Sequence, residues 1–114
     1  IRLIQVVWEF VVREKAEQRF MLVFGPGGAW SRAFCDAPGY RGTTLLCDIS
    51  DSRRFLVFDL WDSAPAREEY LGKHPDGASQ LDVALAELVE RKTELGVFHM
   101  RADATVRARP KRRV

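Results

Sequence analysis

The stretch that decides the fold is RRFLVFDLWDS, residues 53–63. It is rich in aromatic and aliphatic residues and ends on an Asp-Ser pair, which is typical of a strand that runs into a helix N-cap. One side of this strand is wholly apolar and consists of Leu56, Phe58 and Leu60. The other side adds a carboxylate to aromatic and aliphatic side chains, namely Phe55, Val57, Asp59 and Trp61. We therefore predict a small sheet protein that keeps this second face for a ligand.

Residues 3–12 alternate in the same way and predict the first strand. Its apolar side carries Ile4, Val6, Trp8, Phe10 and Val12. Its mixed side carries Leu3, Gln5, Val7, Glu9 and Val11. Residues 42–49 predict a further strand, which a turn of hairpin length joins to the strand over residues 53–61.

Helical spacing of apolar residues predicts helices over residues 15–24, 29–37 and 64–73. We expect a last helix from the capping-box pattern at residues 79–82 to Gly96, followed by a strand over residues 97–101. The order β-α-α-β-β-α-α-β is that of an α+β, ferredoxin-like split βαβ sandwich. Right-handed crossovers would place the first and third strands centrally in a four-stranded antiparallel sheet and all helices on one face. Residues 1–102 form this predicted domain and residues 103–114 a basic tail.

The helices are expected to cover the wholly apolar strand sides: Ile4, Val6, Trp8, Phe10, Leu56, Phe58, Leu60, Phe98 and Met100. The other face would then carry Gln5, Val7, Glu9, Leu45, Cys47, Phe55, Val57, Asp59, Trp61, Val97, His99 and Arg101. A face of this apolar and partly charged kind usually marks an interface or a ligand groove. A homodimer that packs two such sheets into a barrel would bury it and leave a cavity in each subunit.

Composition and charge limit the classes of function and partner that we expect. The chain has 114 residues, of which 46% are hydrophobic and 30% charged, as expected for one soluble globular domain. No apolar run reaches the roughly 20 residues that a membrane span needs, so we expect no membrane partner. The body is slightly acidic and only the tail is basic, so we do not expect nucleic acid as a partner. Cys35 and Cys47 fit no metal or disulfide spacing, which favours buried free thiols in a reducing cytoplasm, no metal and no cofactor.

Five short strings carry a resemblance to a known family: Trp8-Glu9-Phe10, GPGGAW (residues 25–30), PGYRGT (38–43), FDLWDS (58–63) and LGVF (95–98). In order and spacing they resemble the antibiotic-biosynthesis-monooxygenase type of dimeric α+β barrel, over about residues 3–101. That family includes cofactor-independent oxygenases of polycyclic aromatic polyketides and haem-degrading enzymes. Trp61 matches the strand Trp of its oxygenases. Val57 stands where the polyketide enzymes carry an Asn, and this chain contains no Asn.

Asp59 and Trp61 are the first candidates for chemistry, because residues two apart on a strand point the same way. Asp59 could accept a proton from a phenol or an activated C–H group, with a pKa raised by burial, while Trp61 stacks on a flat ligand. The structural alternative is that Trp61 packs in a dimer and Asp59 pairs with Arg101 or Arg54.

Glu9 and His99 are the second candidates, because a carboxylate that orients an imidazole is a known base arrangement. The alternative is a hydrogen-bonded pair without turnover. Arg101 would hold an anion or neutralise Glu9. The remaining predicted substrate contacts are Phe55, Val57, Tyr40 and Tyr70.

These residues predict a cofactor-independent monooxygenase of a small polycyclic aromatic, polyketide-type substrate. Two alternatives use the same cavity. One is a polyketide cyclase or isomerase that works by proton transfer, and the other is a haem- or small-ligand-binding protein without catalysis.

Overall fold

The computed structural model describes residues 2–111, apart from the side chain of Ala78. Along the chain the elements are β1 (Ile4–Val12), α1 (Glu17–Val23), α2 (Ala29–Phe34), β2 (Tyr40–Asp48), β3 (Asp51–Trp61), α3 (Ala64–Lys73), α4 (Pro75–Ala86), β4 (Val89–His99) and the 3-10 turn η1 (Ala102–Ala104). The predicted order of strands and helices is confirmed. Arg112 and Arg113 of the predicted basic tail lie outside the described residues.

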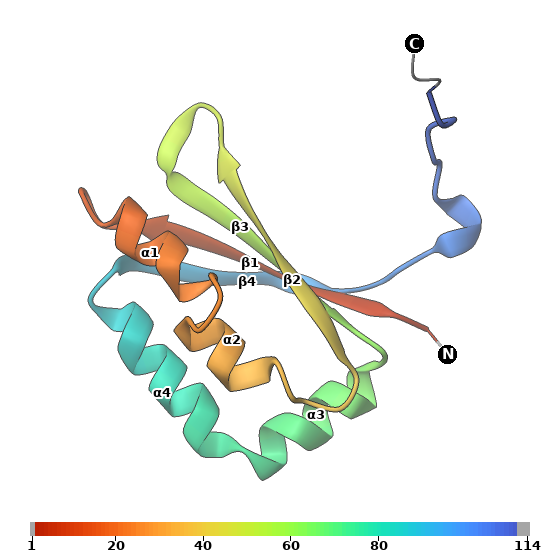
Figure 1. The fold of residues 1–114 in the computed structure, drawn as a ribbon, viewed down its shortest axis with the longest axis horizontal. Helices are drawn as coiled ribbons and strands as arrows, with labels where there is room; N and C mark the ends of the chain where they lie inside the picture. The colour runs from red at the N-terminus through yellow and green to blue at the C-terminus, as the bar shows by residue number, and fades with distance from the viewer. Residues whose placement is uncertain (1, 112–114) are drawn as a thin grey trace.

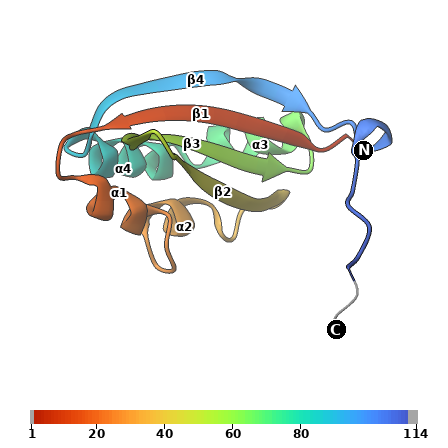
Figure 2. The ribbon, with the colours of Figure 1, turned by 90° about the horizontal axis from the view of Figure 1, so that it is seen from above.

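The four strands form one antiparallel sheet in the order β2-β3-β1-β4 (Figure 1). β1 and β3 are central, as predicted. All four helices lie on one face of the sheet, and the other face carries no helix (Figure 2). The fold is therefore the α+β, ferredoxin-like one, with an open sheet whose two edges are β2 and β4.

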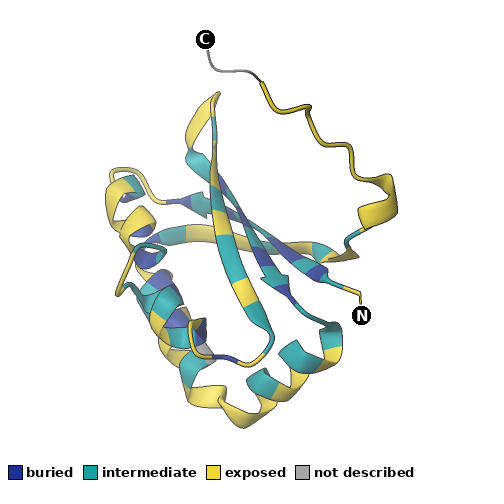
Figure 3. Cartoon of the chain, turned by 45° about the vertical axis from the view of Figure 1, so that its right-hand side comes forward, coloured by how far each residue is buried: buried dark blue, intermediate teal, exposed yellow. Residues whose placement is uncertain are grey.

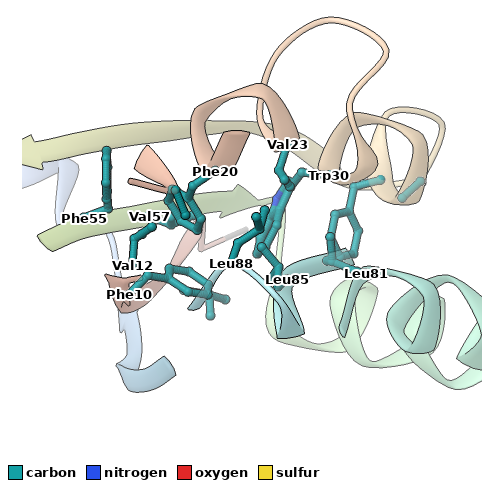
Figure 4. Close-up of a cluster of buried hydrophobic side chains, with 14 of the residues drawn as sticks. Phe10, Val12, Phe20, Val23, Trp30, Phe55, Val57, Leu81, Leu85 and Leu88 are labelled. Carbon is teal, nitrogen blue, oxygen red and sulfur yellow. The ribbon is translucent and has the colours of Figure 1, made fainter. Parts of the chain in front are cut away.

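The hydrophobic core lies between the sheet and the helices, and Figure 3 shows the buried residues gathered there. Figure 4 shows side chains of this cluster from both central strands, from α1, α2 and α4, and from the turn after α4: Phe10, Val12, Phe20, Val23, Trp30, Phe55, Val57, Leu81, Leu85 and Leu88. Each of the ten exposes less than a tenth of its surface. Burial of such apolar surface is the main stabilising contribution to a fold of this size.

The predicted orientation of β3 is wrong. β3 pairs with β1 so that Trp61 lies opposite Ile4, and Asp59 lies opposite Val6. Directly opposed residues of neighbouring strands share a face. The side with Phe55, Val57, Asp59 and Trp61 therefore faces the helices, and Leu56, Phe58 and Leu60 lie on the open face.

The faces of β2 and β4 also differ from the prediction. On β2, Leu45 and Cys47 pair with Val57 and Phe55, so they belong to the helix side and not to the open face as predicted. On β4, Phe98 pairs with Gln5, which puts Phe98 on the open face. Of the predicted strand faces, only that of β1 is correct.

The last helix and strand also differ from the prediction. α4 begins at Pro75 and ends at Ala86, and β4 begins at Val89 rather than at Val97. The apolar stripe of Leu81, Leu85 and Leu88 does face the core. The segment that follows, residues 90–94 with four charged side chains, belongs to β4, which pairs with β1 as the outermost strand, so the helix predicted to extend to Gly96 is too long.

After β4 the chain leads away from the sheet and the helices (Figure 1). Residues 101–111 are exposed, and apart from η1 they form no regular element. Among residues 2–111, none of the helices has the length and apolar character that a membrane crossing requires.

Candidate active site

Asp59 is the one charged side chain among residues 2–111 that is buried in the core, with 4% of its surface exposed. Its Oδ1 accepts a hydrogen bond of 3.0 Å from the Trp30 indole Nε1 on α2. The same oxygen accepts a 2.5 Å hydrogen bond from the Thr43 hydroxyl on β2. A buried carboxyl is tolerated only when such donors replace the water it has lost. Neutral donors therefore hold Asp59 in place.

A bulge in β2 brings Tyr40 into this cluster. The register with β3 shifts between Tyr40 and Gly42, so that Tyr40 and Thr43, three residues apart, lie on the same face. Gly42 has a φ of 134°, a conformation that favours glycine. The Tyr40 hydroxyl contacts the Thr43 hydroxyl. Since Thr43 donates to Asp59, its oxygen accepts from Tyr40, and the three groups form one chain of hydrogen bonds.

Burial changes the acidity of both ends of this chain. Loss of solvent raises the pKa of Asp59, and the hydrogen bonds from Thr43 and Trp30 partly oppose that effect. The buried indole N–H of Trp8 lies near the carboxyl group and favours its ionised form without completing a hydrogen bond. Burial likewise raises the pKa of Tyr40. The cluster can accept a proton at Asp59 and pass one between hydroxyl groups.

Four rings form an aromatic wall beside the cluster: Phe34, Tyr40, Trp61 and Tyr70. The Tyr40 and Trp61 centroids lie 5.3 Å apart, and those of Trp61 and Tyr70 lie 6.1 Å apart. The Tyr70 hydroxyl donates a 2.7 Å hydrogen bond to the Ala33 carbonyl, which ties α3 to α2. His74 stacks on Tyr70 with a centroid distance of 4.2 Å.

Two clefts open at Tyr70. The first, the apolar cleft, has a volume of about 510 Å³ and lies between the loop before β2 and α3, with Pro38, Gly39 and Ala66 in its lining. The second, the polar cleft, has a volume of about 380 Å³ and lies between α2 and the start of α4, with Arg32 and Asp76 in its lining. Both volumes suit small-molecule ligands.

The aromatic wall links the apolar cleft to Asp59. Tyr70 lines the cleft and packs on Trp61, and Gly39 of the cleft precedes Tyr40 in the chain. The Gly39 carbonyl also accepts a hydrogen bond of 2.7 Å from the Asp62 backbone N–H, which fixes the loop against the end of β3. The hydrogen-bonded chain from Tyr40 to Asp59 thus begins beside the cleft and ends in the core.

The structure separates the predicted pair of Glu9 and His99. Glu9 lies opposite Thr93, whereas His99 lies opposite Ile4, which places the two about 17 Å apart along β1. Glu9 is on the open face, where the Arg54 guanidinium donates to its carboxylate over 2.8 Å. The predicted base arrangement of these two residues is therefore wrong.

The other predicted pairings fail as well. Arg101 is exposed and pairs with Asp103 over 3.3 Å, rather than with Glu9 or Asp59. Arg54 pairs with Glu9 and, over 3.1 Å, with Asp48. Among residues 2–111, no cation forms an ion pair with Asp59, whose side chain lies on the helix side of the sheet, opposite to that of Arg54.

Of the predicted substrate contacts, the structure brings Tyr40, Tyr70 and Trp61 together in the aromatic wall. Phe55 and Val57 are fully buried in the core and line no cavity on the open face. Tyr40 and Tyr70 had been placed by type alone.

Sequence reasoning missed three residues of the site, Trp30, Thr43 and His74. Trp30 lies in the core, and the sequence gives no sign of its hydrogen bond to Asp59. Thr43 follows Gly42, and this glycine is the only local feature of the sequence that could have indicated the bulge. His74 lies between α3 and α4 and lines both clefts.

The fold places the chain among the single-sheet, ferredoxin-like α+β domains. Neither a protein-family model nor a curated protein sequence matches the chain. Among the described residues, no three His, Cys, Asp or Glu side chains come together as metal ligands.

Solved structures with the same fold include SnoaB, a cofactor-independent oxygenase from Streptomyces nogalater. It is 21% identical with a TM-score of 0.67, and the match covers 89% of this chain and 95% of that one. A candidate antibiotic biosynthesis monooxygenase from Bordetella bronchiseptica is 17% identical with a TM-score of 0.66, over 89% and 97% of the two chains. Another from Nitrosomonas europaea is 11% identical with a TM-score of 0.66, over 86% and 89%. The predicted resemblance to the antibiotic biosynthesis monooxygenases is thereby confirmed for the fold.

Proposed function

We propose that the protein is a cofactor-independent monooxygenase of a small polycyclic aromatic, polyketide-type substrate. The rings of the substrate occupy the apolar cleft against the aromatic wall. Its proton passes to Asp59 through Tyr40 and Thr43. The observation that carries the proposal is the buried carboxyl of Asp59, joined by Thr43 to a phenol beside the cleft.

Two further features support this function. The fold is shared with SnoaB, which is a cofactor-independent oxygenase. The apolar cleft is also lined by Tyr70, one of the four rings of the aromatic wall, and aromatic side chains bind flat ring systems by stacking.

The reaction begins at an acidic CH₂ group between two aromatic rings, as in an anthrone. The Tyr40 oxygen accepts one proton from this carbon while the Tyr40 proton moves to Thr43 and the Thr43 proton to Asp59. The carbanion gives one electron to O₂, and the two radicals combine to a peroxide. Loss of water then leaves a ketone, so that CH₂ and O₂ become C=O and H₂O.

Oxygen consumption with an anthrone tests this function. The protein should consume one O₂ per quinone formed, and Asp59→Asn should lower kcat by a factor of about 100 or more, the usual contribution of a positioned acid or base. Thr43→Val should act in the same direction because it interrupts the chain to Tyr40. Thr44→Val, on the other face of the same strand, is the matched control and should keep the activity.

Two outcomes would overturn the proposal. Equal product yield without O₂ would identify a cyclase or isomerase that works by proton transfer. Full oxygenase activity of Asp59→Asn would remove the buried carboxyl from the reaction.

The proposal includes a homodimer formed through the open face of the sheet. Leu46, Leu95 and Phe98 each expose about half of their surface there, between 46% and 53%. A second copy that packs on this face would bury them. Sedimentation should give a dimer, and Phe58→Glu should yield a monomer. A monomeric wild-type protein at micromolar concentration would contradict this part.

We also propose a cytoplasmic location. Cys35 and Cys47, the two cysteines of the chain, are unpaired, and both are exposed rather than buried as predicted. Thiols in this state suit a reducing compartment. Fractionation of the source cells, with detection by antibody, would test the location.

A further inference from the structure

The apolar and polar clefts adjoin each other along three shared residues. Tyr70, Lys73 and His74 line both. Tyr70 stands between them, held by its hydrogen bond to the Ala33 carbonyl on α2. A ligand with two chemically different ends can therefore lie across Lys73 and His74 and occupy both clefts.

The polar cleft offers a cation to such a ligand. Arg32 donates a 2.5 Å hydrogen bond to the Gly27 carbonyl, which fixes the side chain but leaves its charge uncompensated. Among the described residues, no carboxylate lies within ion-pair distance of Arg32. Lys73 has a partner in Glu69, over 2.7 Å. Asp76 also lines this cleft but is itself negatively charged, so an anion would bind at Arg32.

We infer that the polar cleft binds the carboxylate of an aromatic acid whose rings occupy the apolar cleft. Arg32 is the residue that sets this specificity, because a guanidinium binds a carboxylate with two parallel hydrogen bonds. Lys73 and His74 line the passage between the two ends of the ligand. The inference rests on the proposed function, since it assumes that rings bind in the apolar cleft.

The sequence alone could not suggest this site. Arg32 is on α2, and Lys73 and His74 are at the junction of α3 and α4. The Tyr70 hydroxyl bond across the two helices brings these segments together. The substrate class narrows accordingly, from any polycyclic aromatic compound to one that carries an acidic side group.

Titration of tryptophan fluorescence with two probes of equal shape tests the inference. The probes are 9-anthracenecarboxylate and its neutral amide, 9-anthracenecarboxamide. The wild-type protein should bind the carboxylate about tenfold more tightly, the usual gain from a hydrogen bond to a charged group. Arg32→Gln should weaken the carboxylate about tenfold and leave the amide unchanged.

Arg19→Gln is the matched control. It removes the same charge from α1, where Arg19 is exposed and lines neither cleft. Its preference for the carboxylate should equal that of the wild-type protein. Lys73→Gln serves as a second variant, and it should reduce the preference less than Arg32→Gln because Glu69 already pairs with Lys73.

The outcomes separate this inference from the proposed function. Equal affinity for carboxylate and amide in the wild-type protein would overturn the carboxylate site and leave the aromatic cleft in place. A preference that persists in Arg32→Gln would overturn the role of Arg32. Failure of both probes to bind would overturn the aromatic cleft, and the proposed function with it.

Discussion

The two faces of the sheet stabilise their charged side chains in different ways. On the helix side a single carboxyl, Asp59, is buried and held by the neutral donors of Trp30 and Thr43. On the open face the carboxylates of Glu9 and Asp48 share the guanidinium of Arg54. An ion pair near water keeps its solvation, whereas a buried pair would lose it. Neutral donors are therefore the arrangement that suits a carboxyl in a core.

The two faces of the sheet also differ in the functions that we propose for them. The helix side holds a titratable group with a raised pKa beside a cleft, and such groups cluster at functional sites. The open face holds apolar side chains at its centre and fixed ion pairs at one end. The proposed reaction therefore belongs to the helix side, and the proposed self-association to the open face.

Phe55 and Phe58 give the largest contrast between the two faces, because they lie on opposite sides of β3. Phe55→Ala should lower the free energy of unfolding by about 3–5 kcal/mol, since it leaves a cavity in the core. Phe58→Ala should cost about 1 kcal/mol in the monomer, because its side chain is only half-buried. Urea denaturation at low protein concentration measures both. Equal losses would contradict the orientation of β3.

Thr43 and Thr44 lie on opposite sides of β2 and test the same difference between the two faces. Thr43→Val removes the hydroxyl donor of Asp59 and should lower the free energy of unfolding at pH 7 by about 1–3 kcal/mol. Thr44 lies on the open face, where its hydroxyl bonds to no side chain of the described residues. Thr44→Val should therefore change the free energy of unfolding by less than about 0.5 kcal/mol. A loss for Thr44→Val as large as that for Thr43→Val would show that the hydroxyl at Asp59 has no special role.

The pH dependence of stability should follow Asp59. Its pKa is higher in the folded protein than in the unfolded chain, so the native state holds the proton more tightly. The free energy of unfolding of the wild-type protein should fall as the pH rises from about 4 toward neutrality, relative to Asp59→Asn. Asp36→Asn, an exposed change of the same kind, is the control. Parallel pH curves for wild type and Asp59→Asn would contradict the raised pKa.

The ion pairs of the open face should give the smallest effect. Glu9→Gln leaves Arg54 with Asp48 as its remaining partner, and exposed ion pairs contribute little. The loss of stability should be smaller than that of Thr43→Val and should shrink further in 1 M NaCl, since salt screens exposed charges. A loss that does not depend on salt would show that Glu9 is held by more than charge.

The sequence predicted the order of the elements, the central strands and the placement of all helices on one face. It could not predict which side of β3 is buried. Alternation separates two sides but does not rank them, and the presence of Asp59 made the wrong side look more apolar. The donors that make its burial acceptable, Trp30 and Thr43, lie 29 and 16 residues away in the chain.

The candidate site was predictable in part. Asp59 and Trp61 were identified by their unusual combination of carboxylate and indole, and they do lie on one face. Glu9 and His99 were grouped because their strands are neighbours, but a pairing register depends on both strands and cannot be read from either one. The clefts depend on the contact between α2 and α3, which no local pattern encodes.

The charged run of β4 has a consequence for solubility. An outermost strand presents unpaired backbone groups on which another chain can add a strand and start an aggregate. Residues 90–94 carry two glutamates, an arginine and a lysine along this rim, and such charges repel an approaching strand. The charged residues that made this segment resemble the exposed side of a helix thus also hinder the addition of further strands at this edge of the sheet.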